Sequence, residues 1–162
     1  MQKNKFSFCL ILLVSLFVSQ SIHAQKLEYE LLYKIELTVD TAIDLGNTPL
    51  GPRIIARITG GSFEGPKLKG KVLASGGDWL LRLDSTTVKL DVRILLETED
   101  RELIYNTYTG FIHQKADKTD YWRIVPLFET SSKKYGWLNY TIAVGVGRDI
   151  KGGVAYDVYA IK

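Results

Sequence analysis

The chain has 162 residues, of which 46% are hydrophobic and 24% charged, a globular composition with enough chain for one domain. Its formal charge is only +3 at pH 7, and Lys3 and Lys5 at the start supply two of those charges, so nothing indicates binding to nucleic acid or to an anionic membrane. Beyond residue 24 there is no cysteine and His113 is the one histidine, which excludes disulfides, thiolate nucleophiles, haem, iron–sulfur clusters and cysteine-based zinc sites.

The first 24 residues have the order of a secretory signal. Two lysines precede an apolar run over residues 6–18, and the small residue Ala24 stands at the expected cut. The run is shorter than the roughly 20 residues that span a bilayer. We expect a signal peptide at 1–24 and a single domain at 25–162. The protein would be exported to the periplasm or the extracellular space, with no membrane contact after cleavage.

Alternating apolar and polar residues then predict strands along the chain. Residues 26–40 alternate almost without a break, which is typical of a long half-buried strand. The same period recurs at 88–97 and 138–146, and a final strand is expected at 154–161. Further strand candidates are 53–59, 68–74, 79–83, 103–112 and 121–130.

Glycine- and proline-rich turns separate these strands, and no window shows a capped helical period. Eight to ten short strands with even turn spacing predict an all-β fold, either a sandwich or an antiparallel β-barrel of lipocalin-like size. Paired glycines suit the sharp bends that close a barrel, and long first and last strands could pair and remove the free edge. The barrel is the favoured interpretation.

Four segments, in this order and spacing, resemble a bacterial and fungal family catalogued as domain of unknown function 3237. They are Thr-Gly-Gly-Ser-Phe-Glu-Gly-Pro at 59–66, Gly-Gly-Asp-Trp at 76–79, Leu-Asp-Val-Arg at 90–93 leading to Glu-Thr at 97–98, and Phe-Glu-Thr at 128–130 followed by Trp-Leu-Asn at 137–139. The resemblance spans about residues 53–159 and implies a compact antiparallel β-barrel. It brings no agreed activity, although fungal relatives are associated with natural-product ring closure.

Charged residues on one predicted strand are the first candidates for binding. Asp91, Arg93 and Glu97 have even spacing and share a face. If that face turns inward, Asp91 and Arg93 form a charged floor that grips a small ligand. If it turns outward, they are solvated residues whose salt bridges contribute little. Alternation favours the outward arrangement and the family resemblance favours the inward one.

Three carboxylates are candidates for acid–base catalysis. Glu64 and Asp78 follow double-glycine turns, where side chains project at a barrel mouth, and with Glu129 they could supply one neutral acid and one ionised base. The alternative is that they only cap backbone N–H groups in turns.

The remaining ligand-binding candidates are aromatic or polar. Trp79 and Trp137 could stack on a ring or fill the core. Arg53, Tyr105 and Asn139 are included on strand position and family resemblance.

Together these features predict an exported barrel that binds a small organic molecule without a cofactor or metal. A cofactor-free isomerase, cyclase or lyase that uses the paired carboxylates is the alternative, and a non-catalytic envelope interaction module is the third. No nucleic acid partner is expected, and association with copies of itself is left open.

Overall fold

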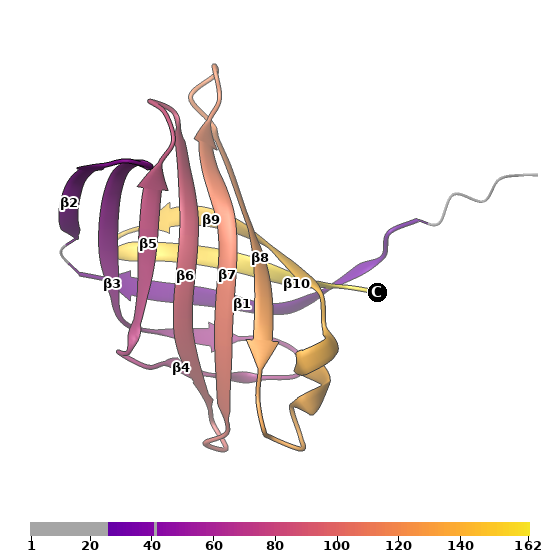
Figure 1. Ribbon diagram of the computed structural model, residues 1–162. Helices are drawn as coiled ribbons and strands as arrows, with labels where there is room; N and C mark the ends of the chain where they lie inside the picture. Colours follow the sequence, from indigo (N-terminus) through magenta and orange to yellow (C-terminus); the bar gives the residue numbers. More distant parts are fainter. Residues whose placement is uncertain (1–25, 41) are drawn as a thin grey trace, which may run out of the picture.

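The computed structural model describes residues 26–40 and 42–162, so the expected signal at 1–24 lies outside the described residues. Ten antiparallel strands form a single sheet that curls into a barrel (Figure 1). In chain order they are β1 Tyr29–Val39, β2 Ile43–Thr48, β3 Gly51–Glu64, β4 Lys69–Val72, β5 Gly76–Arg82, β6 Thr87–Thr98, β7 Leu103–Gln114, β8 Asp120–Glu129, β9 Ala143–Ile150 and β10 Gly153–Ile161. A 3-10 helix, η1, covers Gly136–Tyr140 between β8 and β9.

The wall of the barrel has eight strand positions, because β1 and β2 together fill one position and β4 and β5 together fill another. Strands β1 and β2 pair with one edge of β3, while β4 and β5 pair with its other edge and with β6. Strand β1 also pairs with β10 from Tyr29–Ile161 to Thr38–Gly153, which closes the barrel. The prediction of an antiparallel barrel is confirmed, as is the pairing of its first and last strands.

The double glycine in β3 makes the sharpest bend. Gly60 and Gly61 have φ of +151° and +150°, a conformation that glycine adopts without strain. A Cβ on Gly61 would lie 2.0 Å from the Glu36 carbonyl oxygen, so glycine also allows β1 to approach closely. At this bend β3 changes partner from β5 to β4.

The barrel is packed at one end and hollow at the other. Inward residues near the packed end include Tyr33, whose ring meets those of Phe63 and Phe128 edge-on. The buried Asn106 donates to the Leu127 carbonyl at 2.9 Å and is close to the Tyr33 hydroxyl at 3.5 Å. At the other end the inward side chains leave a cavity between them.

The structure departs from the predicted strands in two places. The strand expected at 138–146 begins only at Ala143, because residues 136–140 form η1. Leu138 packs into the core, and the Asn139 amide exchanges two hydrogen bonds with the Thr130 backbone, at 2.8 and 2.9 Å. Strand β2 is not among the predicted strands, and its side chains are almost all exposed, so it shows no buried face.

No helix in the described ranges is long and apolar enough to cross a membrane.

Candidate functional site

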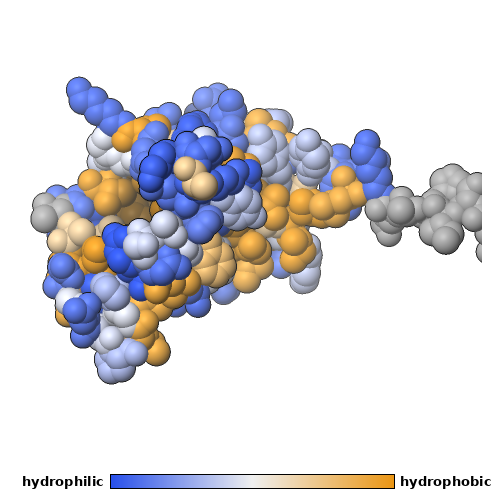
Figure 2. All heavy atoms as spheres, turned by 90° about the horizontal axis from the view of Figure 1, so that it is seen from above, coloured by the Kyte–Doolittle hydropathy of each residue, from blue (hydrophilic) through white to orange (hydrophobic). Residues whose placement is uncertain are grey.

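A cavity of about 330 Å³ lies inside the barrel, at the end that carries the β5–β6, β7–β8 and β9–β10 turns. Figure 2 looks down from the side of the β5–β6 and β7–β8 turns, and apolar side chains show between polar ones there. The cavity wall is mainly aliphatic and aromatic. Its lining residues are Leu37, Val39, Ala56, Ile58, Asp78, Leu80, Leu90, Tyr108, Ile112, Trp122, Asp149, Gly153, Val154 and Tyr156.

Asp78 is the carboxylate set into this apolar wall. It follows Gly77 on β5 and shares its inward face with Leu80, while Trp79 between them turns to the outside. One carboxyl oxygen accepts the Asp91 backbone N–H at 3.0 Å. Burial raises the pKa of Asp78 to about 6, the Asp91 charge adds to that rise, and the hydrogen bond opposes it.

Three aromatic residues with polar atoms stand around the same cavity. Tyr156 on β10 has its ring centroid 5.5 Å from that of Tyr108 on β7 and 5.5 Å from that of Trp122 on β8. Burial raises the pKa of both tyrosines, so both hydroxyls stay protonated and can donate hydrogen bonds. The Trp122 Nε1 is buried and makes no hydrogen bond with any described residue.

Close packing fixes the Trp122 ring in place. A Cβ on Gly147 of β9 would lie 2.5 Å from Trp122 Cγ, so the indole packs against bare backbone. Any larger residue at Gly147 would push the ring into the cavity. The sequence Gly145-Val146-Gly147 therefore shapes the cavity wall.

The charge of the cavity has one sign. Asp78 and Asp149 are the ionisable carboxylates in its lining, and the lining contains no lysine, arginine or histidine among the described residues. An anionic ligand would meet carboxylates and no cation, whereas an uncharged one meets hydroxyl and indole donors. In the part of the chain that the structure describes, no three His, Cys, Asp or Glu side chains gather as metal ligands.

The three predicted catalytic carboxylates lie apart. Asp78 alone enters the cavity, while Glu64 lines a recess on the outer surface and Glu129 lines a shallow one at the end of β8. The paired arrangement that acid–base catalysis would need is not formed among them. On β5 the even-numbered residues Asp78 and Leu80 face inward. Their position after a double glycine does not predict this orientation.

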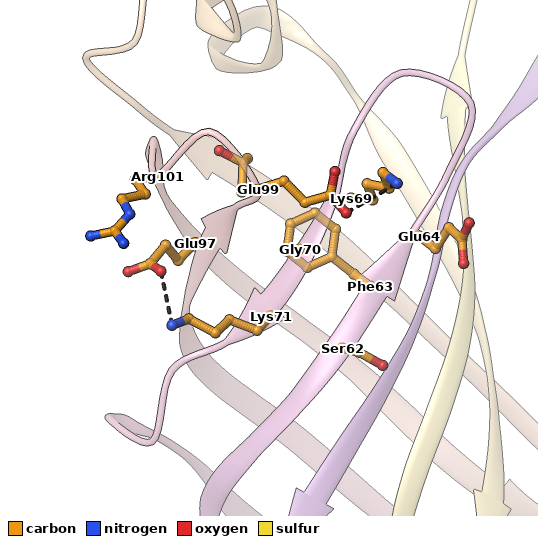
Figure 3. Close-up of a pocket in the computed structure, with 10 residues that line it drawn as sticks. Ser62, Phe63, Glu64, Lys69, Gly70, Lys71, Glu97, Glu99 and Arg101 are labelled. Carbon is orange, nitrogen blue, oxygen red and sulfur yellow. Dashed lines mark ion pairs between the residues drawn. The ribbon is translucent and has the colours of Figure 1, made fainter.

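The recess at Glu64 has a volume of about 650 Å³, larger than that of the cavity inside the barrel (Figure 3). It is open to solvent, and ion pairs neutralise charges in its lining. Lys71 pairs with Glu97 at 2.9 Å and Lys69 pairs with Glu99 at 3.0 Å. Three of these four side chains are more than half exposed, so the pairs contribute little energy. Their charges are satisfied by each other, and we find no group there that is poised for chemistry.

The predicted residues Arg53, Trp79, Asp91 and Arg93 do come together, but on the outside of the barrel. They line a groove beside the β2–β3 hairpin. Arg93 bonds Asp91 at 3.0 Å and its guanidinium lies 5.2 Å from the centroid of the Trp79 ring, while Arg53 donates to the Trp79 carbonyl at 3.0 Å. The face of Asp91 and Arg93 is thus the outer one, and the charged floor inside the barrel does not exist.

The last three candidates lie near η1 or the start of β7. Tyr105 shares the shallow recess with Glu129 and Asn139, whose amide is engaged with the Thr130 backbone. Trp137 is partly exposed on η1, with the Lys67 amine 5.5 Å from its ring. None of them reaches the cavity.

Sequence reasoning missed the aromatic residues of the cavity. Tyr108, Trp122 and Tyr156 sit at inward positions of their strands, where large rings usually fill the core. The signal that could have found them is their polar atoms, since a buried phenol or indole needs a hydrogen-bond partner.

Comparison with known proteins places the chain among small barrels. Residues 27–161 match the family described as protein of unknown function (DUF3237). A UPF0311 protein of Rhodopseudomonas palustris is 26% identical over 148 residues, covering 83% of this chain and 97% of the relative. The hydroalkoxylation enzyme phnH of Penicillium herquei is 32% identical over 117 residues, covering 72% of this chain and 71% of the relative.

Solved structures agree with the fold. A β-barrel-like protein from Acinetobacter baumannii superposes with a TM-score of 0.82 at 38% identity, covering 85% of this chain and 97% of that one. An enzyme from Penicillium herquei gives a TM-score of 0.70 at 25% identity, covering 84% and 95%.

Proposed function

The chain belongs to the DUF3237 family, and we propose that it binds a small, uncharged organic molecule in the barrel cavity. The observation that carries this proposal is Asp78, a carboxyl buried in an apolar wall beside two tyrosine hydroxyls and an unpaired indole N–H. A buried polar group without a partner is costly, so a ligand that accepts a hydrogen bond from the Trp122 N–H gains affinity from a group that is otherwise unsatisfied.

The size of the cavity limits the ligand. A volume of about 330 Å³ is at the small end for ligand pockets, which suits a molecule of one or two rings. The mainly apolar lining favours a hydrocarbon or aromatic body.

The polar groups define where the ligand carries oxygen. Tyr108, Tyr156 and Trp122 can donate to a carbonyl or hydroxyl oxygen. Asp78 accepts a hydrogen bond when ionised and donates one when protonated, so a hydroxyl satisfies it in either state. A phenol or alcohol with an apolar body fits these requirements.

A second candidate is cofactor-free catalysis at the same cavity, favoured by the raised pKa of Asp78, which lies near neutral pH. The fungal relative is named a hydroalkoxylation enzyme, and hydroalkoxylation adds an O–H bond across a carbon–carbon double bond. In such a step the alkene carbon forms a C–O bond and the other alkene carbon takes a proton. A single carboxyl could remove the hydroxyl proton and return one to carbon, so one carboxylate would replace the expected pair.

We also propose that the protein acts outside the cytoplasm, on the signal-like order of residues 1–24. Amino-terminal sequencing of the protein recovered from the periplasm or the medium tests this. A new terminus at Gln25 is expected, and an intact Met1 in the cytoplasmic fraction would contradict it.

Thermal shift with matched probes tests ligand binding. At neutral pH, 2-naphthol should raise the melting temperature by mass action, and the similarly sized anion 2-naphthoate should raise it less. The variant Ala56→Phe fills the cavity and should abolish the shift, whereas Arg93→Ala on the outer groove should retain it. A shift that survives Ala56→Phe and disappears with Arg93→Ala would move the site to the outer groove.

Catalysis is tested separately, with a phenol that carries a side-chain alkene as probe. Its cyclisation should be accelerated by the wild-type protein, with a rate that changes around pH 6, and should be lost in Asp78→Asn. Binding without any turnover would leave the first proposal standing and refute the second.

A further inference from the structure

The outer face of β8 carries an apolar stripe that no described residue covers. Its outward residues Val125 and Leu127 are 48% and 52% exposed, on the part of β8 that pairs with β7 after the pairing with β9 has ended at Ile124. Phe111 on β7 and Val146 on β9 extend the stripe sideways and are 45% and 37% exposed. Both are next to Arg123 in the strand register, while the β7 partners of Val125 and Leu127 are Thr109 and Thr107.

This face is large enough to form the centre of a protein interface. The 10 residues of β8 extend about 34 Å, and three neighbouring strands span roughly 14 Å. The flat area is on the order of 480 Å², somewhat over half of the roughly 800 Å² that each partner contributes to a standard interface. Apolar centre and polar ends are also the usual arrangement within an interface.

The sequence of outward residues on β8 is complementary to itself. In order they are Arg123, Val125, Leu127 and Glu129, a cation and an anion on either side of two apolar residues. If a second copy lies antiparallel on this strand, Val125 meets Leu127 of the second copy and Arg123 meets Glu129 of the second copy. A two-fold axis near Pro126 generates both ion pairs at once, as an isologous interface requires.

Both charges are available for such pairing. Arg123 donates one N–H to the Trp122 carbonyl at 2.9 Å and rests 4.9 Å from the Tyr121 ring, which holds the guanidinium over the face. Neither Arg123 nor Glu129 forms an ion pair with a residue in the described ranges. Arginine has five N–H donors, so a carboxylate from another molecule can still bind.

We propose that this face is a homodimer interface, formed by two copies of the chain packed sheet on sheet across β8. The inference does not depend on the cavity ligand, since the face is the outer side of the barrel wall. It is independent of the outer groove beside the β2–β3 hairpin as well.

Sedimentation equilibrium of the purified protein tests the proposal through a charge swap. The wild type should be dimeric at micromolar concentration. Either Arg123→Glu or Glu129→Arg alone places like charges together and should weaken the dimer at least about tenfold. The double variant R123E/E129R restores opposite charges and should return the dissociation constant to within about threefold of wild type.

Two further variants complete the test. Leu127→Lys introduces a charge at the apolar centre and should yield a monomer with an unchanged circular dichroism spectrum. The control swap K71E/E97K reverses a surface ion pair elsewhere and should leave the dimer unchanged. A monomeric wild type, or a dimer in which Leu127→Lys or the single charge reversals have no effect, would overturn the proposal. Disruption that the double variant fails to repair would overturn the antiparallel register.

Discussion

Replacing Asp78 by Asn should make the protein more stable at neutral pH and change its stability much less in acid. Burial raises the pKa of Asp78 to about 6 from an ordinary value of 3.8. Between these values the folded chain keeps a proton that the unfolded chain has released, so the stability contributed by this group falls as pH rises. At roughly 1.4 kcal/mol per pH unit, the ionised carboxylate costs about 3 kcal/mol above pH 6.

The comparison of variant and wild type isolates this cost. Other carboxylates work in the opposite direction, because ion pairing and hydrogen bonds lower the pKa of Glu30 and Asp100 and so add stability as pH rises. Because the variant and the wild type share these carboxylates, their contributions cancel in the difference between the two free energies of unfolding. The amide that Asp78→Asn introduces can still accept the Asp91 N–H, and any cost of burying its NH₂ group is the same at every pH.

Urea unfolding near pH 3.5 and pH 7.5 provides the assay. The stability of Asp78→Asn relative to wild type should rise by about 3 kcal/mol between the two pH values. Asp120→Asn, at an exposed position, should show no such rise. If the free energies of unfolding of Asp78→Asn and wild type differ by the same amount at both pH values, Asp78 is not held in a desolvated site. The proposed role of its raised pKa would then be refuted.

The remaining predictions concern packing. Gly147→Ala should destabilise the fold by about 1–3 kcal/mol and change tryptophan fluorescence, because its Cβ would collide with the Trp122 ring. Gly136→Ala, whose Cβ meets nothing within 4 Å, is the control, and equal effects of the two would contradict the packing described. Asn139→Ala should cost about 1–2 kcal/mol in urea unfolding through loss of two backbone bonds to Thr130, yet leave 2-naphthol binding intact. Lost binding in a folded variant would make Asn139 a ligand contact.

The barrel could be predicted from sequence because apolar and polar residues alternate along its long strands. Leu90, Val92, Ile94 and Leu96 all point inward, as their alternation with polar residues indicates. Alternation misled at 138–146 because Leu138 reaches the core from a 3-10 turn, whose conformation depends on tertiary bonds to Thr130. Local periodicity carries no information about such distant partners.

The site was harder to predict, since it depends on which face of a strand a residue occupies. Glu64 and Asp78 both come after a double glycine, yet only Asp78 lines the cavity. Tyr108 and Trp122 are indistinguishable in sequence from core-filling rings. They share one cavity with Asp78 because the curled sheet brings β5, β7 and β8 around the same interior.

The measurement that tests the central claim most directly is an NMR titration of the Asp78 carboxyl, with and without 2-naphthol. A buried, ligand-binding Asp78 should titrate near pH 6 in the free protein, and its pKa should move when 2-naphthol is added to wild type but not to Ala56→Phe. Titration in the ordinary range of an exposed aspartate, with no response to the probe, would contradict the account.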